Sequence, residues 1–329
     1  MFKWGIIGLG RIAHKFANEL HSSGIGKVLA VGSRDLSKAN SFADEYDIPE
    51  RYGSYEDFID NAEVDAVYIA VPHHLHYSLT RQCLKQRKPV LCEKPFTINC
   101  KQLLDLTTIA REHHVFLMEA MWSRFLPHII WLKSLVDEKK YGNILHMKAE
   151  FCFKGKERGI QLGLSRLLEN ELGGGALLDI GIYPIFLSHL LLGAPDDIQA
   201  HSSIVNAIDE TSMVMFSYPS GATAYLESSI LWESEGQACI YFEHATILIP
   251  KRWHESNEII IKDISGVTKT EQWVYPSRGF YYEMKEVQEC IAQGKTESSL
   301  MSLDFSLGLM QTLDKIRQIV GLKYPADEQ

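Results

Sequence analysis

Short apolar runs alternate with amphipathic helical patterns over the first 120 residues of the chain. A run that is apolar along nearly its whole length predicts a strand covered on both faces, and apolar residues at helical spacing predict a helix. Strands are predicted at residues 3–7, 27–32, 65–71, 89–92 and 115–118. Helices are predicted at residues 11–20, 36–46, 55–61, 75–86 and 100–113. This alternation indicates an α/β domain with a doubly wound parallel sheet, residues 1–120.

The pattern changes after about residue 120. Longer segments alternate in polarity, which is typical of an antiparallel sheet with one face toward the core. Strands are predicted at residues 144–153, 198–205, 212–218, 222–230, 238–242, 258–264 and 272–275. Pro219-Ser220-Gly221 predicts a hairpin turn, and residues 281–293 and 303–319 predict two closing helices. Residues 121–329 therefore form a predicted second domain with helices and a mainly antiparallel sheet.

The composition is that of an ordinary globular protein, with 46% hydrophobic and 23% charged residues in a chain of 329. The net charge is −9, and no block of Lys and Arg provides the charge pattern of a nucleic-acid-binding protein. No apolar run approaches the roughly 20 residues that span a bilayer. We therefore expect neither nucleic acid nor a membrane as a partner.

The six cysteines are scattered without a CxxC pair, which is typical of reduced thiols. The sequence from Phe2 onward reads directly as a first strand, so we expect no signal peptide and a cytoplasmic location. His73, His74 and His76 lack acidic or cysteine partners at the spacing of a metal site, so no metal is expected.

The sequence GLGRIA, which begins at Gly8, matches the dinucleotide-binding pattern GxGxxG/A between a predicted strand and a predicted helix. Gly8 permits the tight turn, Gly10 lets the backbone approach a pyrophosphate, and Ala13 allows close helix–strand packing. Arg11 and Ile12 open the helix, whose first N–H groups are available to phosphates. We predict a dinucleotide site here. A tight turn without a ligand is the alternative.

The end of the second predicted strand bears on the choice between NAD and NADP. An NAD enzyme usually has Asp or Glu there for the ribose 2′-hydroxyl, whereas this chain has Gly32-Ser33-Arg34-Asp35. Arg34 can lie against the adenine and pair with a 2′-phosphate, to which Ser33 can donate a hydrogen bond. We interpret Asp35 as the N-cap of the next helix rather than as a ribose acceptor. These residues favour NADP, with NAD as the alternative.

A lysine follows another predicted strand, in the sequence Glu93-Lys94-Pro95. Ligands bind at the carboxyl ends of strands in an open α/β sheet, and a lysine there can hydrogen-bond a substrate oxygen and move a proton. The alternative is a surface lysine before a turn proline, which the tripeptide alone does not exclude.

A glycine-rich stretch, residues 173–175, leads into a predicted helix that carries Asp179 and Tyr183. Their i, i+4 spacing predicts that both lie on one face of its first turn. Beside the ammonium of Lys94 the phenol would have a lowered pKa, and a tyrosinate could accept the proton of a secondary alcohol. Asp179 could orient the lysine or bind a substrate hydroxyl. The alternative is a helix in which the tyrosine packs and the aspartate caps.

These motifs, in this order, resemble those of the Gfo/Idh/MocA oxidoreductases, and the resemblance covers nearly the whole chain. It rests on GLGRIA, Ser33-Arg34-Asp35, Pro72 to His76, Glu93-Lys94-Pro95, MEAMWSRFLP from Met118, and GGGxxxDxGxY ending at Tyr183. The chain is most similar to the branch of dimeric dihydrodiol dehydrogenases, which also oxidise D-xylose with NADP. Many relatives have His where this chain has Tyr183, which favours this branch over the inositol dehydrogenases.

The resemblance implies an N-terminal Rossmann domain, a C-terminal α/β domain with an open antiparallel sheet, and a homodimer, or a higher homo-oligomer, assembled through those sheets. It places Pro72 and His76 along the nicotinamide side of the cofactor, and Glu93 and Lys94 near the nicotinamide ribose and the substrate. It also implies a cis peptide before Pro95. Residues 154–164 stand where relatives have a substrate loop, and their polar sequence leaves the substrate open.

Four aromatic residues at the ends of elements in or near the second domain could wall a pocket over the nicotinamide. They are Trp122, Phe153, Trp253 and Phe280. Together they fit a site that stacks against the C–H face of a sugar or the ring of an aromatic diol. Packing in the core or at an interface is the alternative for each of them.

The resulting hypothesis is hydride transfer between NADP and a secondary alcohol or carbonyl of a polyol, sugar or trans-dihydrodiol. Tyr183 exchanges the hydroxyl proton, Lys94 lowers the pKa of that phenol, and Asp179 positions both. Lys94 as the proton carrier is the alternative, because a coupled pair titrates as a unit. Two other functions stay open: reduction of a ketose or anhydro-sugar, and dinucleotide sensing by a regulator without catalysis. A regulator has no need of the proton-handling residues.

Overall fold

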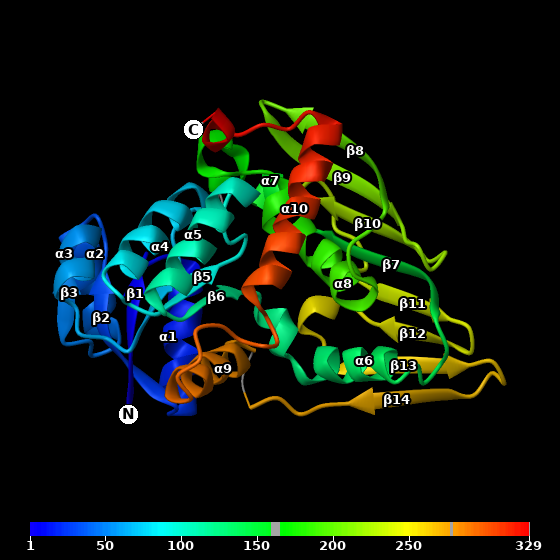
Figure 1. The fold of residues 1–329 in the computed structure, drawn as a ribbon, viewed down its shortest axis with the longest axis horizontal. Coiled ribbons are helices and arrows are strands. Elements are labelled where there is room, and N and C mark those ends of the chain that lie inside the picture. Colours follow the sequence, from blue (N-terminus) through cyan, green and yellow to red (C-terminus); the bar gives the residue numbers. More distant parts are fainter. Residues whose placement is uncertain (159–164, 277–278, 329) are drawn as a thin grey trace. The chain divides into compact units, whose positions relative to one another are not determined.

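The computed structural model describes residues 1–158, 165–276 and 279–328 (Figure 1). The chain forms two compact units, the first made of Met1–Phe125 with Pro276–Leu307 and the second of Leu126–Tyr275 with Gly308–Gln329. This division differs from the single boundary expected at residue 120, because the chain returns to the first unit for one helix that packs against another near the N-terminus. Local periodicity reveals a helix but not the unit against which it packs.

A parallel sheet forms the core of the first unit, in the order β3-β2-β1-β4-β5-β6. Its strands are β1 (Phe2–Ile7), β2 (Gly26–Gly32), β3 (Glu50–Tyr52), β4 (Ala66–Ile69), β5 (Val90–Glu93) and β6 (Leu117–Ala120). Its helices are α1 (Arg11–Ser23), α2 (Leu36–Glu45), α3 (Tyr55–Asn61), α4 (His76–Lys85), α5 (Cys100–His113) and α9 (Phe280–Ala292). Short 3-10 turns lie at His73–Leu75 and Trp122–Phe125. The strand order reverses between β1 and β4, and in such sheets the ligand binds at that reversal.

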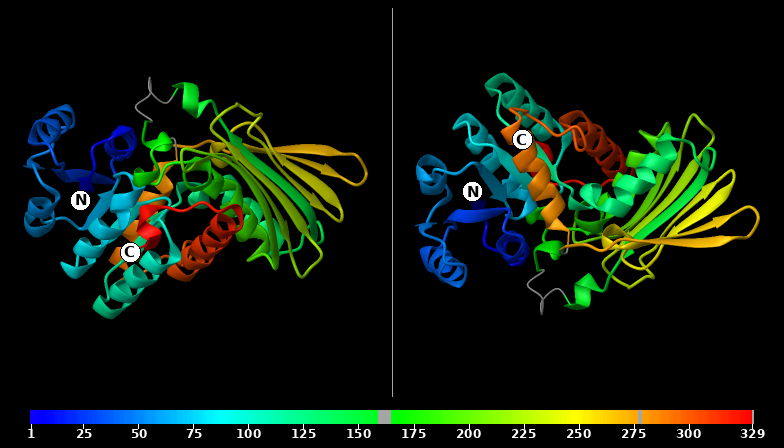
Figure 2. Two further views of the ribbon diagram at one scale, coloured as in Figure 1. Left: turned by 90° about the horizontal axis from the view of Figure 1, so that it is seen from above. Right: turned by 90° about the horizontal axis from the view of Figure 1, so that it is seen from below.

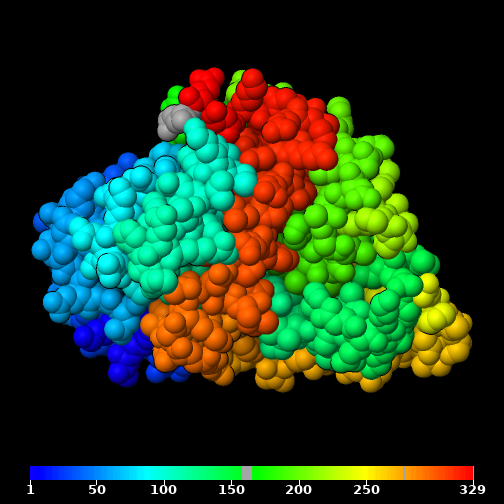
Figure 3. Space-filling model, in the orientation of Figure 1, coloured from blue at the N-terminus to red at the C-terminus, as the bar shows by residue number. Residues whose placement is uncertain are grey.

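The helices of the first unit show the amphipathic pattern that predicted them. In α5 the buried residues include Leu103, Leu106 and Ala110, whereas Leu104 is 55% exposed. The exposed side of this helix is visible at the surface in Figure 3. Its start is fixed by Asn99, whose side chain accepts a hydrogen bond from the N–H of Gln102.

A mixed, mainly antiparallel sheet forms the second unit, in the order β14-β13-β12-β11-β7-β10-β9-β8. Its strands are β7 (Ile144–Cys152), β8 (Asp197–Val205), β9 (Ile208–Ser217), β10 (Thr223–Ser229), β11 (Ala238–Phe242), β12 (Ala245–Ile249), β13 (Glu258–Asp263) and β14 (Thr268–Gln272). Strands β7 and β10 pair in parallel and the other neighbours pair antiparallel. Gly221 makes the predicted turn between β9 and β10 with a φ of +84°.

Helix α8 (Ile182–Leu192) packs on one face of this sheet, against β7 and β10 (Figure 2). The other helices are α6 (Pro127–Asp137), α7 (Gly155–Arg158) and α10 (Leu303–Val320), which begins in the first unit. Short turns lie at Ser165–Leu168, Asn170–Leu172, Trp253–Glu255 and Pro325–Glu328, and a π-helical turn, η5, at Leu177–Gly181. Among the described residues, Asn170–Leu192 is apolar and long enough to cross a membrane, but 89% of its most apolar window is buried. Core packing accounts for its composition.

Three elements of the second unit were missed or displaced in the sequence prediction. Helix α6 contains an unbroken apolar run, residues 129–132, which fits a strand as well as a helix. Strand β12 was not predicted, and the strand expected at residues 272–275 is β14, at Thr268–Gln272. Because β14 is an edge strand that is exposed along most of its length, it lacks the alternation that a half-buried strand shows.

Candidate functional site

The turn after β1 presents open space at the start of α1. Gly8 has a φ of +90°, and a Cβ at this position would lie 2.6 Å from the carbonyl oxygen of Ala70. A Cβ on Gly10 would meet nothing within 4 Å in the part of the chain that the structure describes. Among the described residues, no side chain forms a capping hydrogen bond at the start of α1. Unpaired helix N–H groups at the strand-order reversal fit the pyrophosphate of a dinucleotide.

The turn after β2 holds Ser33, Arg34 and Asp35. The Oδ1 of Asp35 accepts a hydrogen bond of 2.8 Å from the N–H of Ser37, which confirms Asp35 as the N-cap of α2. Ser33 is buried, and its Oγ accepts a hydrogen bond of 3.2 Å from the N–H of Asp35. Arg34 is exposed. Burial raises the pKa of Tyr55, and the charge of Arg34 opposes that rise, so the guanidinium lies near this phenol.

Lys94 lies directly after β5, and the Lys94–Pro95 peptide is cis, as the resemblance implied. Glu93 accepts a hydrogen bond from the hydroxyl of Tyr68 and another, of 3.2 Å, from the backbone N–H of Lys94. The Lys94 side chain is half-buried. The ammonium therefore stands at the carboxyl edge of the sheet, the edge that also carries the Gly8 turn.

His76 connects the segments that follow β4 and β5. It is fully buried, with Nδ1 2.8 Å from the carbonyl oxygen of Pro95 and Nε2 2.9 Å from that of Val71. Both ring nitrogens thus face backbone carbonyls. The half-buried Pro72 precedes the 3-10 turn that leads to His76. His76 thereby holds the backbone at Pro95, next to Lys94. The contact of Pro72 and His76 with nicotinamide stays a prediction.

Glu119, a buried residue on β6, was not among the site residues predicted from the sequence. The residue is only 2% exposed. Its Oε1 accepts a hydrogen bond of 3.0 Å from the N–H of Phe96, and its Oε2 accepts one of 2.7 Å from the hydroxyl of Ser306. Burial raises the pKa of Glu119 to about 7, and the nearby charge of Lys94 opposes the rise. Glu119 belongs to the MEAMWSRFLP sequence, which was noted only for its resemblance.

In the second unit, Asp179 lies in η5 and Tyr183 in the first turn of α8. The i, i+4 spacing predicted one face of the first turn of an α-helix, whereas Asp179 lies in a π-helical turn, with i→i+5 bonds, that precedes α8. Asp179 is 7% exposed, and its Oδ1 accepts a hydrogen bond of 2.9 Å from the guanidinium of Arg166. Arg166 is an ion-pair partner that sequence reasoning did not provide.

Tyr183 is buried within a cluster of aromatic rings. Its ring centroid lies 5.5 Å from that of Phe151 and 5.3 Å from that of His254. Phe151 and His254 are stacked, 4.2 Å apart with an interplanar angle of 18°. Neither of these two residues was a sequence candidate. The signal for Phe151 was its place two residues before the candidate Phe153.

A buried aspartate anchors the start of η5. Asp209 on β9 is fully buried, and its Oδ2 accepts from the N–H of Leu177 at 2.7 Å and from the hydroxyl of Ser212 at 2.8 Å. Its Oδ1 has no hydrogen-bond partner among the described residues. Burial raises the pKa of Asp209 to about 7. Gly175, with a φ of +111°, passes so close that a Cβ there would collide with Oδ1.

Comparison with known proteins gives the context of these residues. Residues 2–121 match the oxidoreductase family with an NAD-binding Rossmann fold, and residues 129–248 match the Gfo/Idh/MocA C-terminal domain. Trans-1,2-dihydrobenzene-1,2-diol dehydrogenase of Xenopus tropicalis is 34% identical over 335 residues, which cover 98% of this chain and 99% of that relative. The chain belongs to the Gfo/Idh/MocA oxidoreductase family.

Two solved structures share the fold of this Gfo/Idh/MocA protein. Levoglucosan dehydrogenase in complex with NADH and levoglucosan has a TM-score of 0.87 at 18% identity, over 97% of both chains. KijD10, a 3-ketoreductase from Actinomadura kijaniata in complex with NADP, has a TM-score of 0.80 at 23% identity, also over 97% of both chains. The protein is thus an NAD(P)-dependent oxidoreductase acting on CH–OH groups, and the predicted family and fold class are confirmed.

The aromatic candidates of this Gfo/Idh/MocA enzyme divide between the two units. Trp122 and Phe280 stack within the first, with centroids 5.6 Å apart and an interplanar angle of 7°. Phe153 is partly buried against an apolar cluster that includes Ile180. Trp253 is 0% exposed, and its indole N–H donates to the carbonyl oxygen of Glu150 at 3.0 Å. Core packing, the alternative kept open for Trp253, accounts for its position.

The expected substrate loop is described only in part. Residues 154–158 include the short helix α7, in which Lys156 pairs with Glu210. Residues 159–164 lie outside the described residues.

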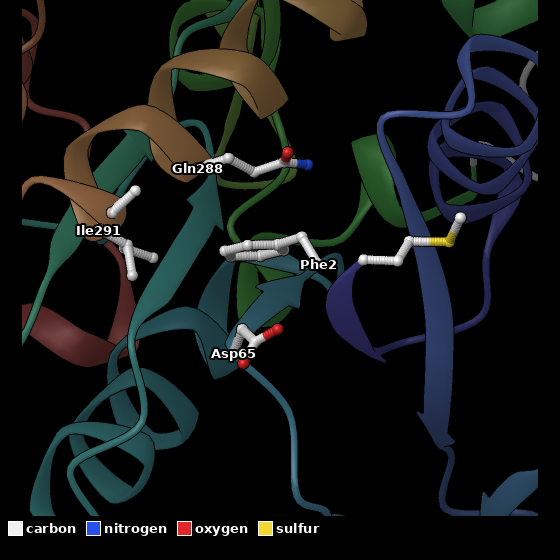
Figure 4. Close-up of a pocket in the computed structure, with 6 residues that line it drawn as sticks. Phe2, Asp65, Gln288 and Ile291 are labelled. Carbon is white, nitrogen blue, oxygen red and sulfur yellow. The ribbon is translucent and has the colours of Figure 1, made fainter.

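A cavity of about 390 Å³ in the first unit lies at the other edge of the parallel sheet (Figure 4). It is lined by Met1, Phe2, Asp65, Gln288, Ile291 and Ala292. Phe2 begins β1 and Asp65 directly precedes β4, so the cavity marks the amino ends of these strands. Since ligands of open α/β sheets bind at the carboxyl ends, this cavity is not the dinucleotide site.

Proposed function

We propose that this enzyme transfers hydride between NADP and a secondary alcohol, or the corresponding carbonyl, of a sugar, polyol or trans-dihydrodiol. The observation that carries the proposal is the half-buried Lys94 at the carboxyl edge of the sheet that also carries the Gly8 turn. The dihydrodiol class is supported by the relative from Xenopus tropicalis. All six cysteines are free thiols, which supports a cytoplasmic enzyme.

The residues at the first unit's carboxyl edge fit the cofactor. The open turn at Gly8 and Gly10 and the uncapped first N–H groups of Arg11 and Ile12 suit a pyrophosphate. When bound, the nicotinamide accepts or donates the hydride. NADP is proposed over NAD because Asp35 already caps α2, whereas the exposed Arg34 is suited to a 2′-phosphate.

We further propose that Lys94 and Tyr183 act on one substrate oxygen. An ammonium beside a phenol stabilises the phenolate, which can then accept the hydroxyl proton during alcohol oxidation. Asp179, paired with Arg166, is suited to accept a hydrogen bond from a neighbouring substrate hydroxyl. Proton transfer by Lys94 itself is the alternative within this proposal.

We propose a homodimer assembled through the sheet of the second unit. Helix α8 packs on one face of that sheet. On the strands, residues that alternate with the buried ones include Met213, Met215 and Tyr241, which are 37%, 52% and 37% exposed. Exposed apolar side chains gathered on a sheet face are suited to a second copy of the chain.

A spectrophotometric screen tests the function. Oxidation of aldoses and trans-dihydrodiols with NADP, and reduction of keto-sugars with NADPH, is followed by the absorbance of the reduced nicotinamide. We expect turnover with at least one class. No turnover with any class, in protein shown to bind the dinucleotide, would contradict the proposal.

The cofactor preference has its own test in Arg34→Ala. A charge-assisted contact to phosphate contributes about 1.5–3 kcal/mol, so we expect the KM for NADP to rise roughly tenfold or more while the KM for NAD changes little. Lys38→Ala, which removes another cation from the first turns of α2, serves as the matched control. Equal rises for both dinucleotides would overturn the assignment to NADP.

A further inference from the structure

We propose that Glu119 is the positioning residue for Lys94. In this view its carboxylate holds the loop that carries the lysine, and its ionisation controls how firmly the ammonium is held. The inference rests on the proposed function in that it takes Lys94 to act on the substrate oxygen.

The geometry of Glu119 connects three elements of the first unit. Strand β6 lies beside β5, with Glu119 opposite Cys92, two residues before Lys94. One carboxylate oxygen binds the N–H of Phe96, two residues after Lys94, and the other binds Ser306 at the start of α10. Residue 119 thus contacts the chain on both sides of the lysine, through strand pairing at Cys92 and through its carboxylate at Phe96. A hydrogen bond to a charged acceptor is stronger than a neutral one, so this hold weakens when Glu119 is protonated.

The electrostatic surroundings couple Glu119 to the lysine. Lys94 is the cation whose charge lowers the pKa of Glu119, Glu93 on β5 raises it, and the Ser306 hydroxyl on α10 lowers it. Cys92 also faces the carboxylate, and burial raises the pKa of its thiol so far that it stays uncharged near neutrality. Because Glu119 is buried, its interaction with Lys94 is little screened by water.

The coupling has a definite sign. Above the pKa of Glu119 the buried anion holds both the loop and the ammonium, and below it the neutral acid holds them less. The rate of alcohol oxidation should therefore rise as Glu119 ionises. Glu119→Gln keeps an oxygen that can accept from Phe96 and mimics the protonated form at every pH.

The first test needs neither cofactor nor substrate. The protein is titrated with pH in the infrared, without cofactor or substrate. Subtracting the spectra of Glu119→Gln from those of the wild type leaves the band of the protonated Glu119 carboxyl and removes that of Asp209. We expect this band to disappear near pH 7 in the wild type. In Lys94→Met it should disappear at higher pH, because the cation that favours the carboxylate is gone. An unchanged midpoint in Lys94→Met would overturn the coupling.

The second test is the pH profile of kcat/KM. We expect Glu119→Gln to be about tenfold slower than wild type above pH 8, equivalent to roughly 1.4 kcal/mol, and to lose the rise near pH 7. Ser306→Ala keeps Glu119 but removes a hydrogen bond that favours the anion, so band and profile should both move to higher pH. A merely structural role would lower the rate equally at every pH, which would overturn the proposal.

The two tests separate this inference from the proposed function. If the infrared midpoint shifts in Lys94→Met but no substrate class is turned over, the coupling between Glu119 and Lys94 is supported and the proposed function is overturned. Turnover that depends on Lys94, with parallel pH profiles for wild type and Glu119→Gln, overturns the positioning role alone.

Discussion

Each unit supports its candidate catalytic segment on a buried carboxylate, but the two carboxylates are satisfied differently. Glu119 uses one oxygen for a backbone N–H and the other for a hydroxyl. Asp209 receives both of its bonds on Oδ2, leaving Oδ1 without a hydrogen-bond partner within the described residues. Burial raises the pKa of each to about 7.

The difference lies in what surrounds each carboxylate. A lysine ammonium contributes to the pKa of Glu119, whereas the groups that lower the pKa of Asp209 are a hydroxyl and backbone N–H groups. No cation is among the main groups that shift the pKa of Asp209 in the described part of the chain, so we expect its ionisation to affect stability. Glu119 interacts with Lys94, so we expect its ionisation to affect the reaction rate. Four experiments, including the one on Glu119 above, test this difference between the two carboxylates.

The largest effect is expected from removing the residues that the two carboxylates support. Lys94→Met and Tyr183→Phe should each lower kcat by about 10²- to 10⁴-fold, the usual contribution of a positioned proton-transfer group. Dinucleotide binding, followed by nicotinamide fluorescence, should remain measurable. If the residues act on one oxygen, the double variant should be little worse than the poorer single one. Losses that multiply would contradict a shared site, and retained turnover in either single variant would remove that residue from the mechanism.

The next effect concerns stability. The folded-state pKa of Asp209, about 7, is above its usual value near 4. The protonated form therefore favours folding at low pH, and this stabilisation is lost as the pH rises from about 4 to about 7, by at most about 1.4 kcal/mol per pH unit.

Asp209→Asn should remove this pH dependence. The free energy of unfolding of the variant, relative to that of the wild type, should therefore be higher at pH 8 than at pH 5. Urea unfolding at both pH values measures the change. The pH profile of kcat/KM should keep its wild-type shape, unlike that of Glu119→Gln. An identical pH dependence of unfolding in wild type and Asp209→Asn would show that Asp209 titrates normally.

The smallest effect on activity is expected among the tryptophans. Trp253 is fully buried, so Trp253→Ala should cost about 3–5 kcal/mol of stability without changing preference among substrates. Trp122, stacked on Phe280, should on replacement by Ala shift the ratio of kcat/KM between dihydrodiols and aldoses by a few-fold. A ratio that changes in Trp253→Ala but not in Trp122→Ala would reverse this assignment.

Most of the fold could be predicted from the chain because its signals are local. A glycine turn after a buried strand, an aspartate that caps the following helix and alternating polarity in β9 and β10 each depend on a few neighbouring residues. The cis peptide at Pro95 followed from the family resemblance. Edge strand β14 and the uniformly apolar α6 were missed or displaced because neither has a clear period.

The supporting residues could not be predicted in the same way. Glu119 and Ser306 are 187 residues apart, and Leu177 and Asp209 are 32 apart, so no sequence window contains either pair. Arg166 could not be predicted as the partner of Asp179, because the sequence does not distinguish an arginine at the surface from one in an ion pair. Because periodicity and motif spacing are local, the amino-acid sequence was enough to predict the two kinds of sheet, the family and the candidate reactive groups. Which buried charge supports which reactive group became visible only in the folded chain, because burial and pairing depend on residues that folding brings together.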